Sequence, residues 1–403
     1  MAGPPPAPSS AGPAPPPAAR VAWWNDRRVR GVVYQIVVLG GVVLLAWYLI
    51  SNTLTNLENR SIATGFAFLE REAGFDVSES PIRYSAADSY FRVLVVGLLN
   101  TLKVSVFGIV LATILGTIVG VARLSSNWLV ARFATVYVEG LRNIPILLQL
   151  FFWYSLITEG LPGPRQALNP VPGVFLSNRG FKIPVPVWET THTLMAIALL
   201  AGIAAAWGLA RWAHRRQERT GRIFPTFRVG AALILGLPLV VYGLGGAPTA
   251  MDAPVLSGFN FQGGATLSPE FAALLIGLVA YTGSYIAEIV RGGILAVSHG
   301  QTEAGLALGL RKSLVMRLIL LPQALRVIIP PLTSQYLNLT KNSSLAVAIG
   351  FPDLVSVANT SINQTGQAIE GIAIIMAVYL TVSLSISAFM NWYNRRIALK
   401  GGR

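Results

Sequence analysis

Long runs of hydrophobic residues alternate with short polar segments along most of the chain. Each run has roughly the 20 residues that an α-helix needs to cross the hydrocarbon core of a bilayer. The pattern therefore predicts an all-α membrane protein with about eight transmembrane helices. Their expected ranges are 31–50, 93–122, 136–157, 193–212, 229–244, 271–290, 322–339 and 372–392.

Arginine and lysine residues gather at alternate connections between these predicted helices. They precede the first helix, separate the second from the third, fill the segment 211–228, lie within residues 303–322 and close the chain. The opposite connections are mixed or acidic. Since basic loops remain in the cytoplasm, both chain termini are predicted to be cytoplasmic. A nucleic-acid surface, which the net charge of +14 could otherwise suggest, is not expected because the basic residues are dispersed over helix ends.

Composition and motif searches argue against an enzyme. Hydrophobic residues make up 53% of the chain and charged residues 12%, whereas soluble domains carry about 25% charged residues. Cysteine is absent, so neither a disulfide nor a thiolate metal site is possible. His192, His214 and His299 are far apart and are expected in structural or solvated roles. No phosphate-binding G-x-x-x-x-G-K-[ST] motif occurs, so we expect no catalytic residues, metal or cofactor, and ATP hydrolysis by a separate subunit.

One polar connection carries a regularly spaced motif. Glu303, Ala304 and Gly305 are followed by Gly309, and Pro322 ends an Ile-x-Leu-Pro sequence. Gly309 suits a helix end that needs positive φ, and Pro322 suits the first turn of the next helix. The pattern predicts a short cytosolic helix between two spans. Glycine and proline alone would favour an ordinary polar loop between two spans, and the complete motif in register favours the short helix.

This spacing resembles the EAA loop of ABC importer permeases, with Gly305 at the third position of the triplet. Further runs are similar to the permeases for polar amino acids, which import histidine, glutamate, glutamine, arginine and opines. These runs are residues 97–102, 142–152, 285–294, 300–304 and 341–345. They occur in the order that the family shows, so the resemblance extends over most of the chain.

The resemblance implies a five-helix type I ABC importer core, formed by the second, third, sixth, seventh and eighth predicted helices. The first helix and a helix pair within the insertion at about 169–263 are additions. This enlarged form is most similar to the permeases of general L-amino-acid importers. The implied domains are a disordered Pro/Ala-rich tail (1–30), an extra helix with its outer loop (31–92), the permease domain (93–393) and a basic tail (394–403).

The resemblance also implies the function and the partners. The chain would be the permease subunit of an ATP-driven importer that moves polar L-amino acids across the bacterial inner membrane. An ATP-binding subunit would grip the loop from Glu303 to Gly309. A second permease subunit, similar or identical, a periplasmic amino-acid-binding protein, the amino-acid substrate and membrane lipid would be the other partners. The competing class, a membrane-embedded enzyme or channel, needs intramembrane carboxylate pairs, a metal cluster or a symmetric filter, and the sequence contains none.

Polar residues within the predicted spans are candidates for the translocation pathway. Ser334, Asn338 and Lys341 or Asn342 recur at helical spacing on one face of the seventh helix. The third helix offers Asn143 and Gln149. Such residues face either an aqueous pathway or neighbouring helices, to which they donate hydrogen bonds, and the sequence leaves both roles open. Glu288 and Arg291, three residues apart, are expected to form a local ion pair.

The segment 343–354 is moderately apolar but too short to span the bilayer. It is predicted to lie at, or re-enter, the outer membrane surface and to help close the outer mouth of the pathway. Lys341 and Asn342 would then attract a substrate carboxylate at the entrance. A loop that merely packs on the bilayer is the alternative.

Overall fold

The computed structural model describes residues 3, 27–59 and 64–397, and it divides into two units. The first unit, up to Gly65, contains the single long helix α1 (Arg27–Asn59), whose apolar part has the length and hydropathy of a membrane span. The predicted tail 1–30 lies outside the described residues except for Gly3 and the start of α1. Most of the predicted basic tail lies outside them as well.

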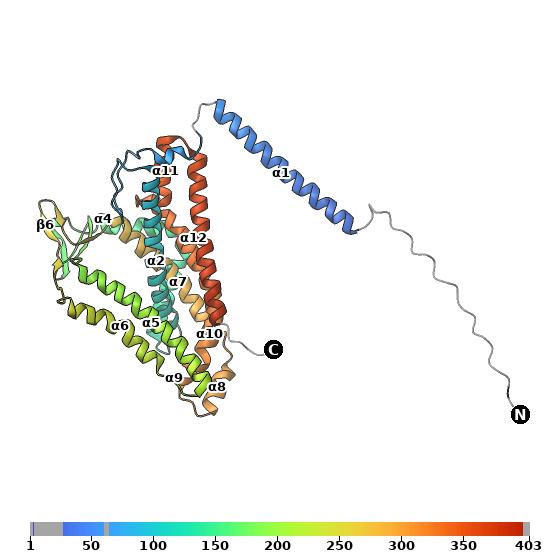
Figure 1. Ribbon diagram of the computed structural model, residues 1–403, viewed down its shortest axis with the longest axis vertical. Coiled ribbons are helices and arrows are strands. Elements are labelled where there is room, and N and C mark those ends of the chain that lie inside the picture. The colour runs from blue at the N-terminus through green and yellow to red at the C-terminus, as the bar shows by residue number, and fades with distance from the viewer. Residues whose placement is uncertain (1–2, 4–26, 60–63, 398–403) are drawn as a thin grey trace. The chain divides into compact units, whose positions relative to one another are not determined.

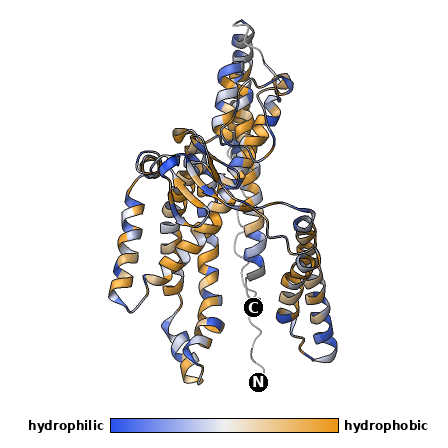
Figure 2. Ribbon diagram, turned by 90° about the vertical axis from the view of Figure 1, so that its left-hand side faces the viewer, coloured by the Kyte–Doolittle hydropathy of each residue, from blue (hydrophilic) through white to orange (hydrophobic). Residues whose placement is uncertain are grey.

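The second unit is built on four long helices that pack side by side (Figure 1): α2 (Tyr90–Ala122), α7 (Pro269–Leu295), α10 (Leu321–Asn342) and α12 (Ala368–Ile397). Helices α2 and α7 approach closely because α2 carries small residues at the contact. A Cβ atom on Gly116 would lie 2.6 Å from Cβ of Ile286. Small residues are the usual means of close helix packing in membranes. Figure 2 shows hydrophobic residues along the helices and hydrophilic ones concentrated at helix ends and connections.

The predicted single helix at 136–157 is wrong. The chain instead forms α3 (Trp128–Asn143) and α4 (Ile146–Thr158), which meet at an angle of 107°. Pro145 explains the break, because the residue before a proline is driven out of the helical region. Ile144 accordingly has extended backbone angles, φ −100° and ψ 126°. With this pair taken as one broken span, the described residues contain up to eight spans, in agreement with the predicted number.

The insertion forms a helical hairpin of α5 (Thr190–Thr220) and α6 (Thr226–Leu244), as predicted. The proline-rich connection that leads into it was expected to be non-helical. Its residues, all of which the structure describes, contain no α-helix but one 3₁₀ turn, and the connections on both sides of the hairpin form short strands that the hydropathy pattern did not predict. The first sheet has the order β1-β2-β3-β8, and the pairs β4-β5 and β6-β7 are antiparallel. The strands are β1 (Leu168–Val171), β2 (Val174–Ser177), β3 (Gly180–Ile183), β4 (Val185–Pro186), β5 (Met251–Asp252), β6 (Val255–Ser257), β7 (Asn260–Gln262) and β8 (Ala265–Leu267).

Short helices complete the fold. A 3₁₀ turn η2 (Phe66–Glu70) precedes α2, and η3 (Pro164–Gln166) precedes β1. Between α7 and α10 lie α8 (His299–Ala307), α9 (Lys312–Val315) and the π-helical turn η4 (Met316–Leu320). After α10 come the 3₁₀ helix η5 (Ser343–Ile349) and α11 (Leu354–Thr365).

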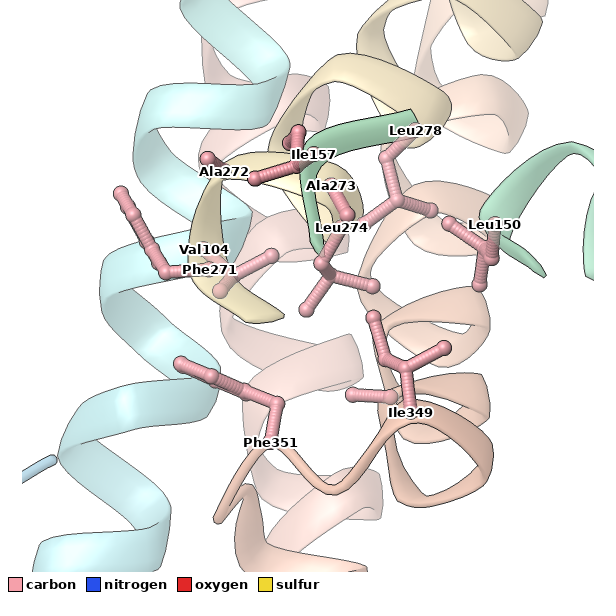
Figure 3. Close-up of a cluster of buried hydrophobic side chains, with 11 residues drawn as sticks. Val104, Leu150, Ile157, Phe271, Ala272, Ala273, Leu274, Leu278, Ile349 and Phe351 are labelled. Atoms are coloured by element: carbon pink, nitrogen blue, oxygen red, sulfur yellow. The ribbon is translucent and has the colours of Figure 1, made fainter. Parts of the chain in front are cut away.

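The main hydrophobic core joins α2, α4, α7 and η5 (Figure 3). Three buried residues of this core come from η5 and the segment that follows it: Ala346, Ile349 and Phe351. The segment 343–354 is therefore packed into the protein core, and its expected place at the outer mouth of the pathway stays a prediction. A 3₁₀ helix repeats about every three residues, so one apolar face of η5 packs inward while Val347 stays exposed.

Candidate functional site

The motif at residues 303–309 forms α8 and the turn that ends it. Gly309 has φ +77°. The N–H of Leu310 donates to the carbonyl oxygen of Gly305 at 3.2 Å, and the N–H of Gly309 donates to that of Leu306 at 2.9 Å. These two bonds constitute a Schellman motif, which needs a left-handed residue at this position. The expected short helix and the positive φ of Gly309 are both confirmed.

Packing explains why glycine occupies position 305. A Cβ atom there would lie 2.9 Å from Cδ1 of Ile319 and 3.0 Å from Cγ2 of Val315. Gly305 is buried, so α8 rests on α9 and η4 through this residue. Glu303 and Ala304 are exposed, and so is 80% of Leu308. The helix thus presents its acidic and apolar side chains outward.

Pro322 does not begin a separate helix. Residues from Lys312 through α10 run on as one candidate span, and Pro322 lies in the first turn of α10 directly after η4. The helix predicted at 322–339 therefore starts ten residues earlier. Proline has no N–H and its ring clashes with the preceding turn. The wider π-helical turn provides room for that ring.

The break between α3 and α4 leaves Asn143 exposed and Gln149 buried. Gln149 is buried, and its Nε2 donates to the carbonyl oxygens of Leu141 and Ile144, both at 2.9 Å. These carbonyls lack helical partners because α3 ends there. The placement favours the structural role for Gln149. Asn143 is exposed at the break.

The polar residues of α10 do share one face. Ser334, Asn338 and Lys341 are exposed, whereas Asn342 is half-buried. A lysine within a candidate span is costly in contact with lipid. The exposed stripe therefore requires either water or a second protein surface beside it.

A cationic and aromatic cluster beside the break was not predicted. The guanidinium of Arg142 lies 5.0 Å from the ring centre of Tyr285, whose hydroxyl is 3.2 Å from that of Tyr281. Helix α3 has 16 residues, and Arg142 lies in its last turn, directly before the break in this candidate span. The i, i+4 spacing of the two tyrosines was the available signal, but both could equally have been packing residues.

The predicted ion pair of Glu288 and Arg291 is confirmed. Nη2 of Arg291 lies 2.6 Å from Oε1 of Glu288. Arg123, at the end of α2, pairs with the other oxygen of the same carboxylate. The carboxylate of Glu288 therefore links the end of α2 to α7 and also links neighbouring turns of α7.

The run 97–102 holds the start of α11. Nδ2 of Asn100 donates to the carbonyl oxygen of Pro352 at 2.9 Å, and the N–H of Leu354 donates to Oγ1 of Thr101 at 3.1 Å. A Cβ atom on Gly97 would lie 2.9 Å from Cα of Leu354. This run thus has a structural role in anchoring α11.

Asp353, at the same place, is a fully buried acid. It accepts a hydrogen bond from the N–H of Ser356 at 2.9 Å and one from the hydroxyl of Tyr379 at 3.4 Å. Burial raises the pKa of Asp353 to about 6, although the backbone hydrogen bond from Ser356 opposes this shift. It serves as the N-cap of α11.

Comparison with known proteins identifies the family. The family described as "Binding-protein-dependent transport system inner membrane component" matches residues 108–399. The chain belongs to this permease family. This confirms the predicted resemblance and the predicted class of helical membrane protein.

Three relatives match nearly the whole chain. The "Putative amino-acid ABC transporter permease protein YhdX" of Escherichia coli is 52% identical over 372 residues, covering 92% of this chain and 95% of the relative. The "General L-amino acid transport system permease protein AapQ" of Rhizobium johnstonii is 50% identical over 374 residues, covering 93% and 94%. The "Glutamate/glutamine/aspartate/asparagine transport system permease protein BztB" of Rhodobacter capsulatus is 45% identical over 409 residues, covering 93% and 95%.

Proposed function

We propose that the chain is the permease subunit of an ATP-driven importer of polar L-amino acids. It works with an ATP-binding subunit, a second permease subunit and a periplasmic amino-acid-binding protein in the bacterial inner membrane. The near full-length identity to permeases named for amino-acid transport supports the substrate class. The distribution of arginines supports cytoplasmic termini and a cytoplasmic α8.

The observation that carries the coupling mechanism is the geometry of α8. The turn that ends helix α8 contains Gly309, which has a left-handed backbone conformation. The buried side of α8 packs against Val315 and Ile319 through Gly305. Its exposed side carries Glu303 and Leu308. A helix fixed on one side and exposed on the other can transmit movement of an ATPase to α9 and α10. Glu303 and Gly309 are therefore the residues of this loop that tolerate change least.

For the pathway, we infer that substrate passes the exposed stripe of Ser334, Asn338 and Lys341 and the cluster of Arg142 with its tyrosines. Broken helices inside the membrane commonly line substrate sites, because their ends offer polar groups there. Arginine, lysine and phenol groups suit the carboxylate of an amino acid. Asn143, exposed at the break, adds an amide to this set.

Replacing Gly309 tests the coupling role. Gly309→Trp forces a side chain into the left-handed region, which costs about 1–2 kcal/mol. That energy would reduce the population of the competent loop, and hence amino-acid uptake, roughly tenfold at an unchanged amount of inserted protein. Uptake is measured with radiolabelled amino acids in cells and normalised to membrane content.

Gly208→Trp is the matched control. Gly208 is an exposed residue of α5, outside the coupling loop, lacks positive φ and has no heavy atom within 4 Å of an added Cβ. It should transport normally. Normal uptake by the Gly309 variant would refute the coupling assignment.

Lys341→Ala tests the pathway role separately. Loss of this cation should raise the KM for acidic amino acids while stimulation of the ATPase by the loaded binding protein persists. Arg326→Ala, another exposed cation of α10, is the control. Unchanged uptake kinetics for every substrate would exclude Lys341 from the pathway without affecting the coupling proposal.

A further inference from the structure

The turn between α5 and α6 is densely basic. This turn and the adjoining helix ends carry six arginines and one acidic residue, Glu218. Oε1 of Glu218 lies 3.3 Å from Nδ1 of His214. We call these arginines the basic foot: Arg211, Arg215, Arg216, Arg219, Arg222 and Arg228. All are exposed except Arg216, which is half-buried.

The length of the hairpin places this foot at the membrane surface. From Thr190 to Arg211, α5 is apolar over about 33 Å, and the 19 residues of α6 extend about 28 Å. Both lengths match the roughly 30 Å hydrocarbon core of a bilayer. By these lengths, Arg211 to Arg222 lie at or beyond the edge of the hydrocarbon core, and Arg228 lies in the first turn of α6.

Aromatic rings contact two arginines of the basic foot. The guanidinium of Arg211 lies 3.5 Å from the ring centre of Trp207, and that of Arg216 lies 5.2 Å from Trp212. Trp212 also contacts Phe224, which lies in the turn itself, edge to face at 5.5 Å between ring centres. Tryptophan favours the membrane interface, and cation–π contacts orient the guanidinium groups.

Large apolar side chains protrude between the arginines. Ile223 is 82% exposed and Phe227 is 88% exposed. Arg211, His214, Arg215 and Glu218 line an open depression on the surface of α5. Basic groups and exposed apolar groups thus alternate around one turn.

We propose that the basic foot binds the phosphate groups of anionic phospholipids, with Ile223 and Phe227 inserted among the acyl chains. Guanidinium groups bind phosphate in a bidentate manner, and basic clusters directly beside a span attract anionic lipid. A protein partner would explain the arginines. It would not explain why they begin where both helices have crossed the hydrocarbon core. The inserted hairpin is therefore a lipid-binding element added to the transport core.

A single labelled cysteine can test this, because the chain contains no cysteine of its own. The full-length chain, purified with its partner subunits, carries an environment-sensitive fluorophore on Ile223→Cys. It is reconstituted into vesicles of phosphatidylcholine alone or with phosphatidylglycerol. Anionic lipid should shift the emission to the blue and increase quenching by brominated acyl chains.

The variant Arg215→Gln/Arg219→Gln/Arg222→Gln should lose this response and retain anionic lipid at least about tenfold less well in native mass spectrometry. Arg27→Gln/Arg30→Gln/Arg132→Gln removes the same charge elsewhere and should behave like the parent. The proposal is overturned if the emission is equal in both vesicle types. It is also overturned if only the ATP-binding subunit shifts the emission, which indicates a protein partner, or if free inorganic phosphate reproduces the shift in phosphatidylcholine.

Discussion

At the scale of single residues, this permease uses polar side chains to hold backbone that its helices leave unpaired. Asn100 and Thr101 secure the segment before α11, and Asp353 caps that helix from a fully buried position. Buried polar groups are costly unless each is bonded. These residues therefore specify how η5 meets α11 more than they add stability.

The stability of the chain should consequently depend on the titration of Asp353. Its pKa is raised from 3.8 to about 6, so the folded state binds this proton more tightly than the unfolded state. Stability therefore falls as pH rises from about 4 to about 6, by ~3 kcal/mol at most. Asp353→Asn retains an N-cap acceptor and should abolish this dependence. Thermal unfolding in detergent at about pH 4.5 and about pH 7.5 measures this pH dependence of stability. An equal pH dependence in the Asp353→Asn variant would contradict the role of Asp353.

At the scale of elements, the α3–α4 break is the feature that most shapes the structure. Pro145 ends one helix, and Gln149 of the next helix bonds the carbonyl oxygens left behind. The same break positions Arg142 beside Tyr285. One proline and one glutamine thus convert a hydrophobic run into two helices with a polar corner.

Gln149→Leu should destabilise this corner. It leaves two carbonyl oxygens without their donor, which costs about 1–3 kcal/mol for buried groups, while the side-chain volume is nearly kept. Leu148→Ala, at an exposed neighbouring position, is the control. Limited proteolysis and thermal unfolding compare the two. A Gln149 variant as stable as the control would show that the two bonds contribute nothing.

At the scale of the whole molecule, we expect that one chain forms only part of the transport unit. The polar stripe of Ser334, Asn338 and Lys341 is exposed although it lies in a candidate span. Such a stripe must face water or protein in a membrane. One set of core helices offers one wall of a pathway, and a second permease subunit would supply the other.

We therefore expect an active complex with two permease subunits about a pseudo-two-fold axis. Native mass spectrometry of the purified, transport-competent complex counts them. Introducing a charge on the stripe, as in Ser334→Asp, should weaken the pairing, whereas Asn363→Asp, at an exposed position of α11 outside the candidate spans, should not. An active complex with one membrane subunit would overturn this expectation.

The sequence by itself determined the number of spans, the inserted hairpin, the family and the turn at Gly309. These features depend on local hydrophobicity, on residue spacing and on the φ angles open to glycine, all of which are readable along the chain. The structure added the broken third helix and the role of Gln149, which follow from Pro145 and from carbonyl oxygens within eight residues of Gln149, local features that hydropathy does not show. The tertiary structure alone decided the burial of residues 343–354 and the cluster around Arg142, because both depend on which distant groups meet, such as Thr101 with Leu354.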